Sequence, residues 1–107
     1  RLVALNKDTG KVAWETVIHD WKLGVSATGA PLVVKGMVIA GIGGGEYGVR
    51  GYLRAYDAKT GDVKWTTYTI PGPGEPGNES WPGDTWKTGG GATWQSGAYD
   101  PELNLLY

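Results

Sequence analysis

The sequence contains no cysteine and no phenylalanine, and only one histidine and one methionine among its 107 residues. The absence of cysteine excludes disulfides and thiolate metal sites within this stretch of chain. No apolar run approaches the ~20 residues that a membrane-spanning helix needs. The formal net charge is −1, so the basic patch that a nucleic-acid partner requires is missing. We therefore expect neither a membrane span nor a nucleic-acid partner for this segment.

The sequence also lacks any segment with the 3.6-residue apolar period of an amphipathic helix. Instead it has 19 glycines and 6 prolines, which favour many turns. Its aromatic residues are 6 Trp and 6 Tyr, whose rings combine a large apolar body with a polar group and suit packing between sheets or against a flat ligand. This composition predicts an all-β fold.

An internal repeat with a period of 51 residues is the main sign of organisation. Residues 1–16, RLVALNKDTGKVAWET, align without gaps to residues 52–67, YLRAYDAKTGDVKWTT. Each copy has the pattern of a strand, a tight turn closed by glycine, and a second strand in which Val and Trp share one face. The repeat predicts two equivalent hairpins.

Further strands are expected between and after the repeats. Residues 29–34 and 37–42 flank Lys35-Gly36, a candidate two-residue hairpin turn. Residues 71–91 contain four Pro and seven Gly, and we expect an ordered, packed loop because loops of this length are usually functional or disordered and this one contains two Trp. Strands are expected to resume near residues 93–99 and 103–107.

Repeated four-stranded units with a turn motif and a packing Trp are typical of a β-propeller. Two such units are fewer than the ~3 that repeat architectures need to bury their faces. The chain also begins at Arg1 without an initiator Met and stops inside the apolar run 103–107. We therefore expect an internal fragment of a longer protein.

Three motifs carry a family resemblance. The pattern Ala-x-(Asp/Asn)-x-x-Thr-Gly-x-x-x-Trp, at 4–14 and 55–65, resembles the tryptophan-docking motif of quinoprotein alcohol dehydrogenases. The segment TGAPLVVKG at 28–36, running into GGGEYGVRG at 43–51, resembles that family's quinone-edge and metal segment. The segment WKTGGGATW at 86–94 resembles its quinone-stacking segment. The resemblance covers essentially the whole chain.

The resemblance implies about two blades of an eight-bladed, periplasmic propeller that oxidises primary alcohols to aldehydes. It implies pyrroloquinoline quinone (PQQ) as cofactor, with a calcium or lanthanide ion, and a cytochrome c as electron acceptor. Residues 1–107 would then be one partial propeller domain, with docking repeats at 1–16 and 52–67, a cofactor and metal loop at 41–51, a long loop at 71–91 and the stacking segment at 86–94.

Glu46 is the candidate metal ligand. It is the only acidic residue in the stretch 41–49, and a carboxylate supplies a hard oxygen ligand for Ca²⁺. An exposed turn residue is the usual interpretation of a lone Glu, but the surrounding GGGEYGVRG motif favours the metal role. Gly43, Gly44 and Gly45 let the backbone approach a flat ligand closely. The family often has Ser and Ala in place of Gly43 and Gly45, so one side-chain hydrogen bond is expected to be missing.

Trp94 is the candidate stacking residue, because a large flat side chain follows a glycine triplet there. The alternative is a packing role like that of the repeat tryptophans, but the Thr-Gly-x-x-x-Trp context is absent. Thr28 resembles the family's quinone-bonding Thr. Ala92 stands where many relatives have another Thr, and Thr93 could replace that hydroxyl, although strand alternation points it to the other face.

No catalytic residue is expected in this chain. The resemblance implies a catalytic Asp and a further metal-binding Asn farther along, so the segment contributes only cofactor- and metal-binding residues and should be inactive alone.

Three other functional interpretations fit parts of the sequence. Residues 43–48 match G-x-G-x-x-G, but a dinucleotide site needs a following helix, whereas a strand pattern follows. A non-enzymatic propeller scaffold, such as an outer-membrane assembly lipoprotein with PQQ-like repeats, would not need Glu46 or Trp94. A sugar-oxidising membrane-bound quinoprotein fits the GGGEYGVRG motif less well.

Overall fold

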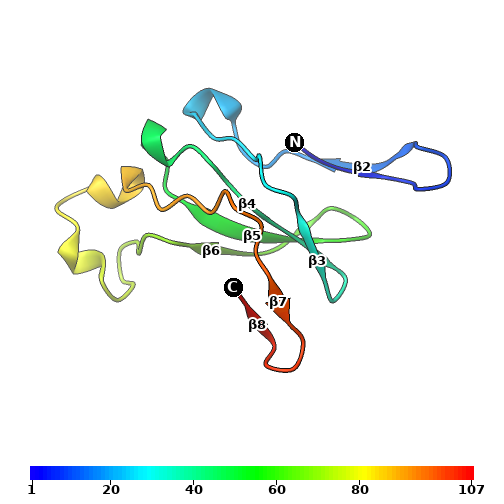
Figure 1. Cartoon of the computed structure of the whole chain (residues 1–107). Coiled ribbons are helices and arrows are strands. Elements are labelled where there is room, and N and C mark those ends of the chain that lie inside the picture. Colours follow the sequence, from blue (N-terminus) through cyan, green and yellow to red (C-terminus); the bar gives the residue numbers. More distant parts are fainter.

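The computed structural model describes residues 1–107 as antiparallel sheets joined by loops (Figure 1). Its strands are β1 (Leu2–Leu5), β2 (Val12–Thr16), β3 (Leu32–Val34), β4 (Met37–Gly41), β5 (Tyr52–Asp57), β6 (Val63–Tyr68), β7 (Tyr99–Asp100) and β8 (Leu105–Leu106). The helical elements are the short 3-10 turns η1 (Trp21–Leu23), η2 (Gly45–Tyr47), η3 (Asn78–Ser80) and η4 (Thr85–Thr88). The expected all-β fold is confirmed, and no helix has the length and hydrophobicity needed to cross a membrane.

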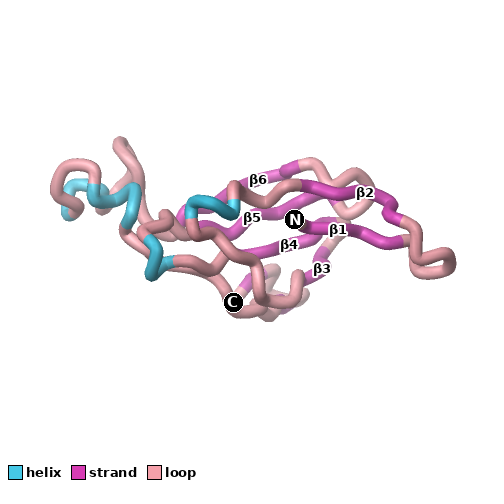
Figure 2. Tube along the Cα trace, turned by 90° about the horizontal axis from the view of Figure 1, so that it is seen from above, coloured by secondary structure: helices cyan, strands magenta, loops and turns pink.

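The central element is a four-stranded sheet in the order β3-β4-β5-β6, with the β1–β2 hairpin before it in the chain and the β7–β8 hairpin after it. Figure 1 shows the two hairpins on either side of this sheet, and in Figure 2, seen from above, β1 and β2 lie over it. A four-stranded antiparallel sheet of sequential strands has the form of one propeller blade. The Lys35-Gly36 turn between β3 and β4 has positive φ at both residues, 47° and 75°, as a two-residue hairpin turn of this kind requires.

The two copies of the sequence repeat form equivalent hairpins. Ala4 pairs with Trp14 in β1–β2, and Ala55 pairs with Trp65 in β5–β6. Each register then shifts directly after the alanine. The turns are also built alike, since the side-chain oxygen of Asn6 accepts two backbone N–H bonds, at 3.0 and 2.9 Å, and that of Asp57 accepts two at 2.8 and 3.2 Å.

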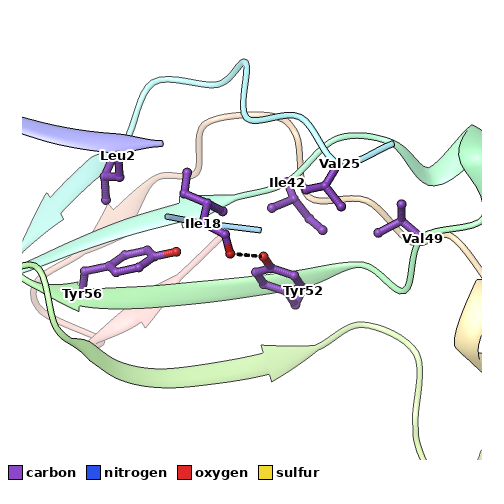
Figure 3. Close-up of a cluster of buried hydrophobic side chains, with 7 residues drawn as sticks. All are labelled: Leu2, Ile18, Val25, Ile42, Val49, Tyr52 and Tyr56. Carbon is purple, nitrogen blue, oxygen red and sulfur yellow. Dashed lines mark hydrogen bonds between the residues drawn. The ribbon is translucent and has the colours of Figure 1, made fainter. Parts of the chain in front are cut away.

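Strand alternation gives the central sheet two apolar faces. One face packs against the N-terminal part of the chain in a core of Leu2, Ile18, Val25, Ile42, Val49, Tyr52 and Tyr56 (Figure 3). The other face presents Val34, Ile39 and Ala55 to the β7–β8 hairpin, which contributes Tyr99 and Leu106. Both apolar faces of the sheet therefore need a neighbouring element to bury them, as each unit of a repeat protein does.

The first hairpin contacts the turn of the second through Trp14. Its indole Nε1 donates to the Ala58 carbonyl oxygen at 3.0 Å, and the hydroxyl of Thr16 donates to the Gly61 carbonyl oxygen at 2.8 Å. A Cβ on Gly61 would lie 2.6 Å from the indole ring. Glycine at this turn is therefore needed for close packing as well as for its φ of 79°.

Four of the expected strands were too long, the one over 37–42 by a single residue because β4 ends at Gly41. β3 begins only at Leu32 rather than at residue 29, because Pro31 has no N–H to donate to a ladder. The strand expected over 93–99 is reduced to Tyr99–Asp100, because the residues before it contact the glycine-rich loop instead of a partner strand. β8 covers only Leu105–Leu106 of the expected 103–107.

Candidate cofactor and metal site

The loop between β4 and β5 is the first component of the site. It begins at an antiparallel bridge in which the Gly43 N–H donates to the Ser26 carbonyl oxygen at 2.8 Å. The backbone then turns through Gly44, with φ of 105°, into η2, and leaves it through Gly48, with φ of 73°. Because these φ values favour glycine, the motif fixes a tight turn that carries Glu46 at its centre, where the side chain is exposed.

The segment 89–94 lies directly on this loop, although about forty residues separate the two in sequence. The Gly51 N–H donates to the Gly90 carbonyl oxygen at 2.7 Å, and the Gly90 N–H donates to the Val49 carbonyl oxygen at 3.0 Å. A Cβ on Gly51 would lie 2.0 Å from the Gly91 carbonyl oxygen. Bare backbone is therefore required where the two glycine-rich segments meet.

Thr93 joins the two segments through its side chain. Its hydroxyl donates to the Tyr52 carbonyl oxygen at 2.6 Å and accepts the Ile42 N–H at 3.2 Å. Both partners belong to residues that are 1% exposed. The hydroxyl of Thr93 is thus bonded to the backbone at Tyr52 and Ile42, and it does not replace the hydroxyl that is absent at Ala92.

Trp94 follows on the open side of the loop. A Cβ on Gly43 would lie 3.7 Å from the Trp94 Cβ, and one on Gly29 would lie 2.5 Å from the Trp94 carbonyl oxygen. The indole remains 55% exposed, and Thr28, which precedes Gly29, is exposed as well. The structure therefore brings the backbone of Gly43 and of Gly29, the residue after Thr28, next to the Cβ and the carbonyl group of Trp94.

A cavity lies against Gly29, Thr93 and Trp94. This cavity of about 340 Å³ is lined by Gly29, Gly41, Ala92, Thr93 and Trp94 together with residues of β3, β4, β5 and the C-terminal segment. Glu46 does not line it. No group of three or more His, Cys, Asp or Glu side chains gathers anywhere in the chain, so Glu46 stands as a single carboxylate.

Arg50 connects the glycine loop to the long loop 71–91. Its guanidinium donates twice to the Ile70 carbonyl oxygen, at 2.9 and 2.7 Å, and pairs with Glu75 at 3.2 Å. The same group lies 3.8 Å from the ring centre of Tyr68 and 4.8 Å from that of Trp86. Through these contacts Arg50 braces the glycine loop against the long loop.

Beneath the loop, Tyr52 is held in a buried polar contact. Its hydroxyl donates to the Ile18 carbonyl oxygen at 3.1 Å (Figure 3) and lies 3.3 Å from His19 Nδ1. Burial raises the pKa of Tyr52 above its usual value of 10.0, against the opposing charge of Arg54. The phenol therefore stays protonated at neutral pH, which fits a structural role for His19 and Tyr52.

One four-stranded antiparallel sheet between two hairpins, joined by glycine-rich loops, has the form of a segment of a β-propeller. The model of the PQQ family, described as glucose/ethanol/alcohol dehydrogenase, beta-propeller domain, matches residues 15–107. The chain belongs to this family.

Individual relatives agree with this assignment. The chain is 52% identical over 118 residues to quinohemoprotein alcohol dehydrogenase ADH IIB of Pseudomonas putida, covering 100% of this chain and 17% of the relative. It is 43% identical over 125 residues to methanol dehydrogenase [cytochrome c] subunit 1 of Methylobacterium organophilum, covering 99% of this chain and 20% of the relative. The structure of a europium-containing methanol dehydrogenase superposes with a TM-score of 0.88 at 41% identity, covering 97% of this chain and 21% of that one.

The chain thus spans about a fifth of the length of the curated relatives it matches. The matches are to alcohol dehydrogenases, so they do not favour the alternative of a non-enzymatic scaffold.

Proposed function

We propose that this chain forms part of the cofactor and metal site of a PQQ-dependent alcohol dehydrogenase, which oxidises primary alcohols to aldehydes. The observation that carries the proposal is the meeting of the loop 41–51 with the segment 89–94, which sets an exposed indole beside backbone that has no side chain. Membership of the PQQ family supports the choice of cofactor.

The residues present fit a planar quinone. Trp94 offers a flat apolar face, 55% exposed, on which a conjugated ring can stack. Gly43, Gly44 and Gly45 have no Cβ atoms that would hold the ligand edge away from the backbone. Thr28 adds an exposed hydroxyl one residue before the contact with Trp94. In the proposed site these residues bind and orient the cofactor.

Glu46 fits a hard cation, because its side chain is exposed at the centre of the tight turn η2. A Ca²⁺ ion takes 6–8 oxygen ligands. One carboxylate cannot complete such a shell, so the remaining ligands come from the cofactor and from residues outside this chain. We propose calcium or a lanthanide ion, and the europium contained in a structurally similar methanol dehydrogenase supports the second choice.

When bound, PQQ would supply a hydride acceptor for the alcohol, and the ion would supply a Lewis acid beside it. The chain's own contribution is positional: Trp94 and the glycine backbone orient the cofactor, and Glu46 holds the cation. No residue of this chain is assigned as the catalytic base.

The surrounding architecture follows from the Trp14 contact. We propose that the packing of Trp14 on the turn 58–61 is the contact between successive blades of an eight-bladed propeller. Trp65, its equivalent in the second repeat, would pack in the same way on the next blade. We further propose a periplasmic location and a cytochrome c acceptor; the name of the methanol dehydrogenase subunit similar to this chain supports the latter.

The substitution Glu46→Gln in the complete enzyme tests the proposal, because it keeps the size of the side chain and removes its charge. We expect metal content, measured by mass spectrometry, to fall and dye-linked alcohol oxidation to fall with it, with partial rescue by excess metal. Glu102→Gln, at an exposed glutamate in the β7–β8 turn, is the matched control and should change neither. Full metal occupancy with normal turnover in Glu46→Gln would contradict the assignment.

A further inference from the structure

Ser26 is a residue for which neither the sequence motifs nor the fold supplied a role. It pairs with Gly43 in an isolated antiparallel bridge, and both of the hydrogen bonds that it makes run through its backbone, at 2.8 and 3.4 Å. Its hydroxyl therefore has no partner within the chain, and the residue is exposed.

The position of this hydroxyl is unusual. A Cβ built on Gly43 would lie only 2.6 Å from Ser26 Oγ, a distance shorter than van der Waals contact. The same Cβ would lie 3.7 Å from the Cβ of Trp94. The Ser26 hydroxyl thus fills the space that a side chain at position 43 would take, next to the Cβ atom of Trp94.

The direction of the hydroxyl follows from its neighbours. Val25 and Ile42, which adjoin the bridge on its two strands, both point into the buried core (Figure 3) and are 9% and 1% exposed. Because successive residues of extended chain point to opposite faces, Ser26 and the missing side chain of Gly43 face away from that core. Thr28, two residues on, shares this face in an extended chain.

We propose that Ser26 is a further cofactor-binding residue, whose hydroxyl forms a hydrogen bond with a polar oxygen on the edge of the planar quinone. This inference rests on the proposed function, since it takes the ligand at Trp94 to be PQQ. It also gives Gly43 a second reason to be glycine, because a side chain there would displace the Ser26 hydroxyl from its present position. Residues 26 and 43 therefore form a pair whose side chains compete for one space.

The test is an equilibrium titration of the complete apoenzyme with PQQ, in the presence of excess Ca²⁺, followed by quenching of tryptophan fluorescence. Ser26→Ala removes the hydroxyl without creating a clash. A single hydrogen bond of this kind predicts a dissociation constant about three to ten times higher than that of the wild type. Ser80→Ala, which removes a loop hydroxyl bonded to the Gly77 carbonyl oxygen, is the matched control and should bind PQQ as the wild type does.

A double variant that exchanges the two residues tests whether PQQ binding requires a hydroxyl in this space, whichever residue carries it. Gly43→Ser alone should weaken binding, because its side chain collides with Ser26. The double variant Ser26→Gly with Gly43→Ser returns one hydroxyl to the same space and should recover most of the lost affinity, a non-additivity expected only of residues in contact.

The outcomes distinguish this inference from the function on which it rests. A wild-type enzyme that binds no PQQ would overturn both. If the wild type binds PQQ and Ser26→Ala binds it equally well, the role of Ser26 is refuted while the proposed function stands. A double variant no better than Gly43→Ser would likewise refute the pairing of residues 26 and 43.

Discussion

Replacing Thr93 with valine should destabilise the site without removing a group assigned to cofactor binding. The hydroxyl of Thr93 is the one side-chain link described between the glycine loop and the segment that carries Trp94, with bonds of 2.6 Å to the Tyr52 carbonyl oxygen and 3.2 Å from the Ile42 N–H. Valine has nearly the same shape, so the packing is kept and both backbone partners lose their hydrogen bond.

The size of the expected loss in unfolding free energy follows from the burial of the two backbone partners of the Thr93 hydroxyl. Ile42 and Tyr52 are each 1% exposed, so water cannot replace the hydroxyl at either group. A buried backbone group left without a partner costs about 1–3 kcal/mol. Because one of the two bonds is long, we expect Thr93→Val to lower the free energy of unfolding by about 2–4 kcal/mol.

The assay is denaturant unfolding of the complete enzyme, followed by tryptophan fluorescence, together with the PQQ titration. Thr93→Ser is the control, because it keeps the hydroxyl and loses only a methyl group, which should cost at most about 1.5 kcal/mol. PQQ affinity should also fall in the valine variant, since Trp94 is the next residue. Equal stability of the valine and serine variants would refute the linking role of Thr93.

Three further predictions concern single side chains. Trp94→Ala should release PQQ during gel filtration of the complete enzyme, because the stacking face is lost; unchanged cofactor retention would reassign Trp94 to packing. The hydroxyl of Tyr56 is buried without a hydrogen-bond partner, so Tyr56→Phe should raise thermal stability by about 1 kcal/mol, and a clear loss of stability in a melting experiment would contradict this. The pKa of Asp57 is lowered, first by the Lys59 backbone N–H and then by Lys64, so its contribution to stability is present above pH 3.8 and is lost as pH falls through the folded-state pKa. Asp57→Asn keeps the turn, as Asn6 does in the first repeat, and should make acid unfolding less steep in this range; an unchanged pH dependence would refute the role of the charge.

The repeat made the hairpins predictable. Identical spacing of Ala, Gly and Trp in the two copies was enough to place both turns and both strand pairs, because an Asn or Asp side chain and a glycine define such a turn locally. The meeting of the glycine loop with residues 89–94 was expected only through the family resemblance. About forty residues separate the two segments, and no local pattern reports a contact of that span.

The expected strand over 93–99 was wrong, and Ser26 was missed, for a similar reason: local sequence does not report tertiary contacts. Residues 93–98 were expected in a strand, yet their tertiary contacts with Gly41, Gly43 and Gly29 replace those of a ladder, as context often does for β-propensity. Ser26 was missed because a lone serine carries no motif. Its position two residues before Thr28 was the available signal, since alternation puts the two side chains on one face.

The central claim is that the loop 41–51 and Trp94 together form a PQQ and metal site. The most direct test is a crystal structure of the complete enzyme with PQQ and Ca²⁺ or a lanthanide bound. We predict planar density stacked on the Trp94 indole and, with Ca²⁺, an ion about 2.3–2.6 Å from a carboxylate oxygen of Glu46. A cofactor bound away from Trp94, or a metal ion whose ligands do not include Glu46, would contradict the account.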